Sequence, residues 1–230
     1  MNYCVVVPVY NSPYIKEVIS ELIPFGHPLI VVDDGSNDVV DLSDFDSGIT
    51  LLRHEVNMGK GEAILSGAKK AKELGYDCFV TMDADKQHIP SQIQKLLDVY
   101  EEGSIVIGNR DFSGNDVPDS SKFGRKFSNF WVALESWKQL GDTQSGFRMY
   151  PVDILKLPLK NKRFDFEIEI LVFHAYRNRK IIDIEVECYY PPKEERVSHF
   201  DKLHDNIRLT KIHTKLMIQR YLLLRGWLWK

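Results

Sequence analysis

Short runs of apolar and β-branched residues alternate with helix-like patterns along the first half of the chain. These runs are apolar almost throughout, which is typical of strands that are covered on both faces of a sheet. The predicted strands span residues 3–9, 28–34, 49–55, 77–83 and 104–110. Apolar positions at helical spacing predict helices over residues 13–23, 61–74 and 90–101. Repeated strand–helix–strand units of this kind predict an α/β fold with a mostly parallel sheet flanked by helices.

The second half of the chain has a less regular pattern. Its predicted elements are a polar, turn-rich loop over 111–121, helices over 122–139 and 165–178, and strands over 146–151 and 180–190. A second polar loop follows the last strand, and the chain then ends in a helical pattern. We expect one α/β domain over residues 1–200, followed by a C-terminal helical segment over residues 201–230.

The C-terminal segment combines positive charge with an apolar face. Residues 206–230 contain six Lys or Arg and no Asp or Glu. The apolar residues near one helical face are Leu209, Ile212, Leu216, Leu223 and Trp227, and Trp229 follows close to the end. A basic amphipathic helix with tryptophan can lie in a membrane interface. The same pattern fits a helix that packs on the core or against a partner protein, so the sequence leaves these interpretations open.

Composition narrows the class of protein. The chain has 230 residues, 43% of them apolar and 27% charged, and this is enough for a sizeable core. A formal net charge of −3 argues against a general nucleic-acid binder. Cysteines at 4, 78 and 188 lie in apolar contexts without metal-ligand spacing, so we expect buried free thiols and a reducing, cytoplasmic compartment. The N-terminal residues fit a first strand better than a signal peptide, and the oligomeric state is not readable.

Acidic residues follow two of the predicted strands. Asp33 and Asp34 end the second strand, and Asp83 and Asp85 follow the fourth. Because ligands of open parallel sheets bind beyond the carboxyl ends of the strands, we expect these turns to meet at one edge. Hard carboxylate oxygens favour Mg²⁺ or Mn²⁺, which takes its other ligands from water and substrate phosphates. The alternative is a helix-capping turn in which Asp85 starts a helix and Asp83 is solvated.

Two further patterns carry a weaker signal. The turn at 33–38 either connects a strand to a helix or uses its carboxylates to accept hydrogen bonds from a base or a ribose. Residues 57–67 place glycines beside Lys60 at a helix start, but they lack the spacing of a Walker A loop. The helix N-terminus and Lys60 fit a phosphate or nucleobase contact as well as they fit close packing of the helix on the sheet.

Six motifs together carry a resemblance to a known family. In chain order they are "VVPVYN", "VVDDGSND", "NMGKGEAILSGAKKA", "MDADKQHIP", "IVIGNR" and "DTQSGFRMY". Over roughly residues 3–200 the chain resembles the family-2 glycosyltransferases, which have the Rossmann-like GT-A fold. The motifs are most similar to those of the polyprenyl-phosphate sugar transferases, the subgroup of dolichyl-phosphate mannose synthase. The resemblance implies a GT-A catalytic domain over residues 1–200.

The resemblance also implies roles for individual residues on the donor side. The residues expected around the nucleotide are Pro8, Tyr10, Asn11, Asp33, Asp34, Gly59, Lys60, Asp83 and Ala84. The residues expected at the metal are Asp83, Asp85 and Gln87, with Mg²⁺ or Mn²⁺ as the cofactor. Those expected near the donor sugar are Ser145, Gly146 and Arg148.

On the acceptor side, the resemblance implies three arginines. Arg110 begins a loop beside the acceptor, Arg125 faces the acceptor phosphate, and Arg196 meets the donor diphosphate. The chain departs from the subgroup after Arg196, where residues 197–199 read Val-Ser-His in place of a glycine and a lysine-bearing segment. Asp142 precedes "SGFR" and is either a general base or a residue that caps the following turn.

The function implied is an inverting transfer of a sugar from a UDP- or GDP-linked donor to a polyprenyl phosphate, with a divalent cation. The main alternative is transfer to a hydroxyl of a glycan or glycolipid, with Asp142 as the general base. A nucleotidyltransferase is disfavoured, since no glycine-rich basic loop follows the first strand. A non-catalytic nucleotide-binding domain is the remaining alternative. We expect no nucleic-acid partner, and a peripheral position on the inner face of a membrane through residues 206–230.

Overall fold

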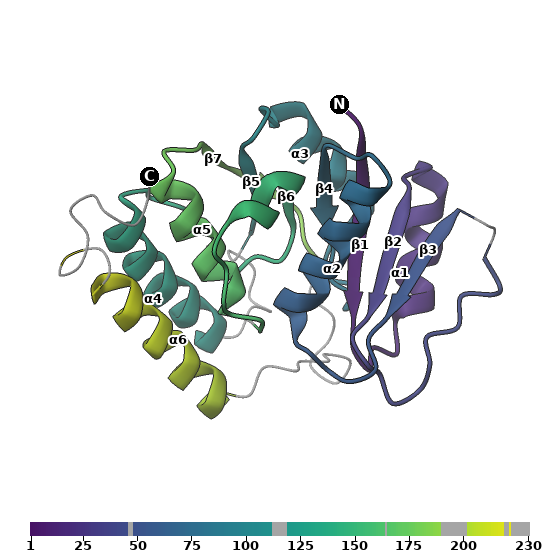
Figure 1. Cartoon of the computed structure of the whole chain (residues 1–230), viewed down its shortest axis with the longest axis horizontal. Coiled ribbons are helices and arrows are strands. Elements are labelled where there is room, and N and C mark those ends of the chain that lie inside the picture. Colours follow the sequence, from purple (N-terminus) through teal and green to yellow (C-terminus); the bar gives the residue numbers. More distant parts are fainter. Residues whose placement is uncertain (46–47, 112–118, 164, 190–201, 219–220, 222–230) are drawn as a thin grey trace.

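A seven-stranded sheet forms the centre of the computed structural model (Figure 1). The structure describes residues 1–45, 48–111, 119–163, 165–189, 202–218 and 221. The strands are β1 (Tyr3–Val9), β2 (Leu29–Asp33), β3 (Ile49–Arg53), β4 (Cys78–Thr81), β5 (Ile105–Arg110), β6 (Arg148–Pro151) and β7 (Ile181–Val186). Their order across the sheet is β3-β2-β1-β4-β6-β5-β7. Each strand lies within a segment that the apolar runs predict.

The sheet is mostly parallel, as predicted. Strand β1 pairs in parallel with β2 and β4, β2 pairs with β3, and β5 pairs with β7. Only β6 runs antiparallel, and it lies between β4 and β5. Because β1 and its two neighbours run in the same direction, the turns that follow these three strands lie at the same edge of the sheet.

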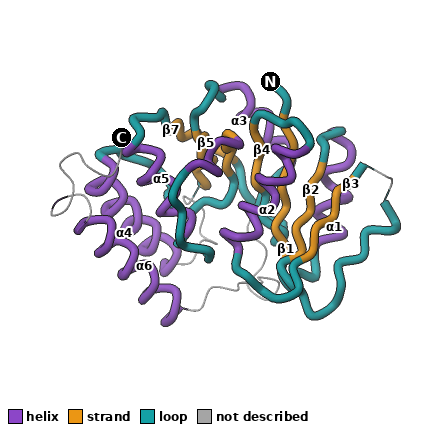
Figure 2. Tube along the Cα trace, in the orientation of Figure 1, coloured by secondary structure: helices purple, strands orange, loops and turns teal. Residues whose placement is uncertain are grey.

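Helices cover both faces of the sheet (Figures 1 and 2). They are α1 (Ile15–Leu22), α2 (Lys60–Glu73), α3 (Ile93–Val99), α4 (Asp119–Ser136), α5 (Phe166–Tyr176) and α6 (Lys202–Ile218). Alternate residues of β1 enter different cores: Val6 packs with the core of α2 and α5, whereas Val5 packs with that of α1 and α3. Both faces are therefore buried, which explains the uninterrupted apolar runs.

The described part of the C-terminal helix packs on the protein core. Leu209, Ile212 and Leu216 of α6 are buried at 7%, 3% and 0% exposure, in the same core as α5. His213 of α6 also pairs with the buried Glu135 of α4, with its Nδ1 2.9 Å from the carboxylate. This face of the segment is thus occupied by protein. The predicted anchors at residues 223, 227 and 229 lie outside the described residues.

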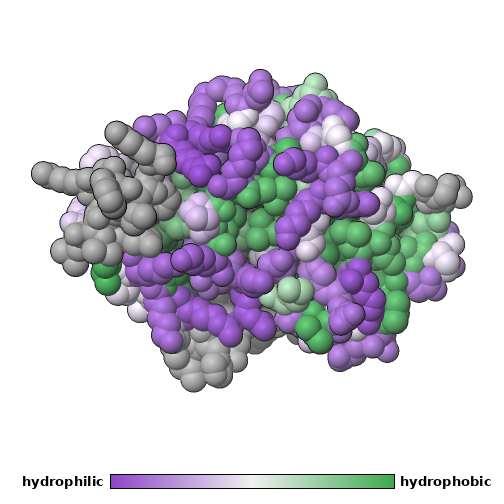
Figure 3. Space-filling view, in the orientation of Figure 1, coloured by the Kyte–Doolittle hydropathy of each residue, from purple (hydrophilic) through white to green (hydrophobic). Residues whose placement is uncertain are grey.

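The surface is mixed in polarity, and the three cysteines differ in burial. Hydrophilic residues cover much of the face shown in Figure 3, with apolar residues gathered between them. All three cysteines are free; Cys4 and Cys78 are buried as predicted, but Cys188 is half-buried because it lies beyond the end of β7. Within the described residues, no helix is both long and apolar enough to span a bilayer.

Candidate active site

The two acidic turns meet at one site, as the sequence predicts. Asp34 follows β2 and Asp83 follows β4, on either side of the central strand β1. The amide of Gly59 donates to Asp34 Oδ2 at 2.7 Å, and Lys60 Nζ donates to Asp83 Oδ2 at 2.9 Å. Since Gly59 and Lys60 are adjacent in the chain, the two turns share one corner, which we call the Gly59–Lys60 corner.

The turn after β1 is locked to the turn after β2. Asn11 has a φ of 47°, and its amide donates to Ser36 Oγ at 2.9 Å. In return, the amide of Asn37 donates to Asn11 Oδ1 at 2.8 Å. Pro8 is buried in β1 and Tyr10 is half-buried at its end. The residues predicted to border a nucleotide base therefore lie together on this side of the site.

Asp33 stabilises the same turn from inside. The side chain is 1% exposed, and its Oδ1 accepts a hydrogen bond from the amide of Ser36 at 2.9 Å. Its other oxygen forms an ion pair with the guanidinium of Arg53 at the end of β3. Arg53 also donates to the carbonyl of Ser36 at 3.0 Å. Asp33 therefore fixes the backbone on which Asp34 lies.

Asp34 is bound by three donors within the protein. It accepts hydrogen bonds from His54 Nδ1 at 2.7 Å, from the amide of Met58 at 2.9 Å and from the amide of Gly59. His54 Nε2 in turn lies 2.9 Å from the hydroxyl of Ser66 on α2. A carboxylate has about four acceptor positions, so most of those of Asp34 are occupied. Asp34 thus fixes the start of α2, where Lys60 stands.

The second acidic turn is supported by a histidine. The amide of Asp83 donates to His88 Nδ1 at 3.0 Å, so the neutral ring carries its proton on Nε2. His88 is 3% exposed and stacks on Phe147 with 5.0 Å between ring centroids. Burial lowers the pKa of His88, which keeps the ring neutral and able to accept this hydrogen bond. The stacked rings of His88 and Phe147 therefore support the turn that contains Asp83.

The two carboxylates of this turn differ in their environment. Burial disfavours the charged form of Asp83, but Lys60 and the other positive groups nearby together outweigh it and lower the pKa of Asp83. Burial, and then the charge of Asp83, raise the pKa of Asp85. The amide of Gln87 donates to Asp85 Oδ1 at 3.0 Å, and the hydroxyl of Ser12 donates to the carbonyl of Ala84. Within the described residues, Asp83 forms an ion pair with Lys60, whereas Asp85 forms none.

Lys60 is bound between two acidic side chains. Its Nζ lies 2.8 Å from Asp83 Oδ1 and 2.8 Å from Glu167 Oε1 of α5. Burial opposes the charge of Lys60, yet the two carboxylates raise its pKa. With Asp85, the cluster holds three carboxylates and one ammonium, so its charge is −3 + 1 = −2 when all are ionised.

This donor set fits a divalent cation. A charge of −2 would balance the +2 charge of Mg²⁺ or Mn²⁺. Binding of a cation beside Asp85 would also relieve its repulsion from Asp83, which raises the pKa of Asp85. Within the described residues, no group of three His, Cys, Asp or Glu side chains is arranged to hold a metal ion. Mg²⁺ at phosphate sites is usually bound by one or two carboxylates together with substrate phosphates.

The segment predicted to contact the donor sugar lies directly against this cluster. A methyl group at Gly146 would overlap Asp83 Oδ2 and would lie 2.6 Å from Lys60 Nζ and 3.0 Å from Asp83 Cγ, so a larger residue here would displace the side chains of Lys60 and Asp83. The carbonyl of Gly146 accepts a hydrogen bond from the hydroxyl of Thr81 at 2.7 Å. Ser145 is fully buried. The backbone at 145–146 therefore forms one wall of the site.

Arg148 supports that wall from inside the protein. The side chain is fully buried, and its guanidinium donates to three backbone carbonyls. The acceptors are the carbonyls of Ser145 at 2.6 Å, Thr143 at 2.8 Å and Glu167 at 2.9 Å. This arrangement suits a residue that holds the 143–146 segment in place, and its expected contact with a donor sugar stays a prediction.

The acceptor-side arginines lie next to each other. Arg110 forms a bidentate salt bridge with Asp142, in which Nε lies 2.7 Å from Oδ2 and Nη2 lies 3.1 Å from Oδ1. Asp142 is fully buried. Arg125 of α4 donates to the carbonyl of Arg110 at 2.8 Å. The predicted residue Arg196 lies outside the described residues.

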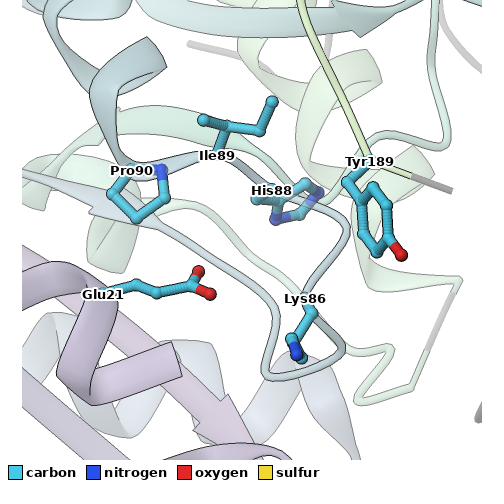
Figure 4. A pocket seen from close by; sticks show the side chains of 6 residues that line it. All are labelled: Glu21, Lys86, His88, Ile89, Pro90 and Tyr189. Atoms are coloured by element: carbon cyan, nitrogen blue, oxygen red, sulfur yellow. The ribbon is translucent and has the colours of Figure 1, made fainter. Parts of the chain in front are cut away.

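A pocket of about 350 Å³ lies beside the acidic turn (Figure 4). Its lining residues are Glu21, Lys86, His88, Ile89, Pro90 and Tyr189. The amide of Tyr189 donates to the carbonyl of Gln87 at 2.9 Å, so the chain after β7 is attached to the turn that follows β4, which contains Asp83 and Asp85. In Figure 4, Glu21 comes from a helix that faces this loop across the pocket.

The sequence pattern did not predict His54, His88 or Glu167 at this site. A signal exists for Glu167, because two glutamates interrupt an otherwise apolar helix and both Glu167 and Glu169 are buried. Buried carboxylates are rare unless they are paired, so this pattern indicates a partner elsewhere in the fold. The histidines carry no comparable signal, since a single histidine near a strand end is common.

Known proteins that are similar to this chain over most of its length include two named glycosyltransferases. The UDP-N-acetylglucosamine–dolichyl-phosphate N-acetylglucosaminyltransferase of Methanococcus voltae is 29% identical over 212 residues, covering 80% of this chain and 84% of that protein. The undecaprenyl-phosphate mannosyltransferase of Micrococcus luteus is 26% identical over 201 residues, covering 81% and 83%. Both names describe transfer to a polyprenyl-type phosphate.

The fold and the family follow from two further matches. Glucosyl-3-phosphoglycerate synthase of Mycobacterium tuberculosis, solved with Mn²⁺, UDP and phosphoglyceric acid, superposes with a TM-score of 0.69 over 95% of this chain and 78% of that one, at 20% identity. This likeness confirms the predicted GT-A fold. The sequence model of glycosyl transferase family 2 matches residues 4–157, which is more than half of the chain. The chain therefore belongs to glycosyl transferase family 2 and is a glycosyltransferase by family.

Proposed function

We propose that this enzyme transfers a sugar, with inversion, from a UDP- or GDP-linked donor to a polyprenyl phosphate, and that it requires Mg²⁺ or Mn²⁺. The observation that carries the proposal is the Gly59–Lys60 corner, which joins the Asp34 turn to the Asp83 turn beside a cluster of charge −2. The names of the two relatives, which describe transfer to dolichyl phosphate and undecaprenyl phosphate, support the choice of a lipid phosphate as acceptor.

On the donor side, the nucleotide lies against the turns that follow β1 and β2. Tyr10 and Asn11 border the base, while Asp33 and Asp34 hold the turn and the start of α2 in place. Asp85 and Gln87 would hold the cation, which when bound would supply a Lewis acid for the charge on the departing diphosphate. Glycine at 146 leaves room for the donor at the wall of the site.

On the acceptor side, Arg110 and Arg125 orient the lipid phosphate. A phosphate is already ionised near neutral pH, so the chain needs to position it and to offset its charge rather than remove a proton. Asp142 holds Arg110 by two parallel contacts and is fully buried. As a general base it would first have to release Arg110, and this disfavours the alternative in which a hydroxyl is the acceptor.

The outer face of α4 is suited to an anionic lipid surface. Phe127, Phe130, Leu134 and Trp137 are 39%, 58%, 36% and 71% exposed, and they recur at helical spacing. The basic residues Lys126 and Lys138 lie on the same segment and are exposed, as is Lys211 of the neighbouring helix α6. Exposed aromatic side chains flanked by positive charge bind the interface of anionic membranes. We assign the peripheral membrane contact to this face, since the described apolar face of α6 is buried.

A transfer assay tests the acceptor. The full chain is incubated with Mn²⁺, radiolabelled UDP- or GDP-linked hexoses and either a polyprenyl phosphate or soluble glycans. We expect labelled, organic-extractable product only with the lipid phosphate, and none after chelation of the cation. Transfer to the glycans alone would overturn the proposed acceptor, and cation-dependent nucleotide binding without any transfer would favour a non-catalytic domain.

A flotation assay tests the lipid surface separately. The full chain is mixed with vesicles of phosphatidylcholine alone or with phosphatidylglycerol added. We expect flotation only with the anionic vesicles, and its loss in a Phe130→Ser, Trp137→Ser variant that retains its circular dichroism spectrum. Equal flotation of the variant would contradict the contact through α4.

A further inference from the structure

Glu167 is a buried carboxylate that the proposed chemistry does not use directly. It lies in the first turn of α5, a helix whose neighbouring residues are almost all apolar. The side chain is 6% exposed and its Oε1 lies 2.8 Å from Lys60 Nζ. Its backbone carbonyl is bound by the buried guanidinium of Arg148 at 2.9 Å, which fixes this turn of the helix. Glu167 is therefore fixed both at its backbone carbonyl, by Arg148, and at its carboxylate, by Lys60.

A carboxylate in this environment has a large desolvation cost, which its ion pair must offset. The same ammonium also binds Asp83, at 2.8 Å. Lys60 is therefore shared between Asp83, in the turn after β4, and Glu167, on α5. If Lys60 lacked Glu167, its whole charge would act on Asp83 and Asp85, and the charge of the cluster would fall from −2 to −1.

We propose that Glu167 is a positioning residue that holds Lys60 against Asp83 and offsets its charge, so that Asp85 is left as the carboxylate for the cation. This inference rests on the proposed function, because it concerns the cation that the donor diphosphate shares. Glu167 acts through Lys60 and touches neither substrate nor cation. It sets how strongly a divalent cation is bound, rather than which acceptor is used.

The direct test measures cation binding rather than turnover. Mn²⁺ binding to the full chain is titrated in the presence of saturating UDP or GDP, by the loss of the free Mn²⁺ signal in electron paramagnetic resonance. Glu167→Gln keeps an oxygen that can accept from Lys60 but removes the charge. We expect the Kd for Mn²⁺ to rise about 10- to 100-fold, as for other residues that orient a metal site from its second layer.

Glu169→Gln is the matched control. Glu169 lies two residues further along the same helix and is fully buried, but it accepts hydrogen bonds from the amides of Lys160 and Asn161, at 2.8 and 2.9 Å. Loss of its charge should affect the stability of the fold and leave the Kd for Mn²⁺ within about twofold of the wild type. An equal rise in both variants would mean that any buried glutamate of α5 gives the effect, and would overturn the proposal.

A double-mutant cycle with Lys60→Met tests whether Glu167 affects cation binding through Lys60. If Glu167 acts through Lys60, then Glu167→Gln should change the Kd for Mn²⁺ much less in the Lys60→Met background than in the wild type. Equal changes in both backgrounds, or an unchanged Kd in Glu167→Gln, would contradict the inference. If the wild type itself shows no cation-dependent nucleotide binding, the proposed function fails first, so the two failures are distinguishable.

Discussion

Replacement of Gly146 by alanine is the most direct test of the geometry at the centre of the site. The new methyl group would lie 2.6 Å from Lys60 Nζ and 3.0 Å from Asp83 Cγ. An unstrained contact between such atoms is about 3.5 Å, so the overlap with Lys60 is about 0.9 Å. The atoms on one side of this contact must move.

The structure indicates which side moves. The backbone of Gly146 is held by the hydroxyl of Thr81 at 2.7 Å, and the adjoining carbonyl of Ser145 is held by Arg148 at 2.6 Å. Lys60 and Asp83 have longer side chains and shift more easily, by about 1 Å. A misplacement of this size costs roughly 100-fold in rate, or about 2.7 kcal/mol of transition-state stabilisation.

The assay compares kcat/KM for sugar transfer with the melting temperature of each variant. Gly48→Ala is the control, because a methyl group there meets no atom within 4 Å. We expect Gly146→Ala to lose about 100-fold in kcat/KM and the control to lose almost nothing. If Gly146→Ala keeps its activity within about threefold of the wild type, then catalysis does not depend on the positions of Lys60 and Asp83. That result would refute the proposal that these two residues form the centre of the active site.

Three further predictions concern other groups. Asp85→Asn should abolish cation-dependent transfer without lowering the melting temperature, because a buried carboxylate with a raised pKa loses charge at little cost to folding. Burial lowers the pKa of His174 from 6.5 to about 4, so its contribution to stability is complete above pH 6.5 and declines as the pH falls towards 4. From pH 7 to pH 5, urea unfolding should show a loss of about 2 kcal/mol that His174→Leu largely removes; an unchanged pH dependence in this variant would contradict it. Burial raises the pKa of Cys4 to about 12 and of Cys78 to about 11, so at pH 8 a thiol reagent should modify only Cys188 in the native protein, and rapid labelling of two or three thiols would refute this.

The strands and helices could be predicted because each pattern is local. An apolar, β-branched run between turn residues identifies a strand such as β1 wherever it lies in the sheet. The position of β6 could not be predicted, because pairing between β4 and β5 depends on a connection through α4 that leaves no periodicity in the sequence. The acidic turns were predictable because the rule for parallel sheets fixes which ends of the strands carry ligands.

The partners of the predicted site residues were much harder to infer. Lys60 could be placed near a phosphate or base, but its ion pairs join it to Asp83, 23 residues further along the chain, and to Glu167, 107 residues further along. Asp34 was expected to meet a base, whereas most of its acceptor positions are taken by His54 and by two backbone amides. Side-chain saturation of this kind depends on three-dimensional packing, which residue types alone do not specify.

The Gly59–Lys60 corner has a consequence for how this enzyme can be altered. Gly59 contacts Asp34, in the turn proposed to border the nucleotide, and Lys60 contacts Asp83, in the turn proposed to hold the cation. A substitution that moves the Asp34 turn to accept a different base should therefore also displace the ammonium of Lys60, beside Asp83. Selection for a new donor nucleotide should thus yield variants whose preference between Mg²⁺ and Mn²⁺ has changed as well, even when no acidic residue has been mutated.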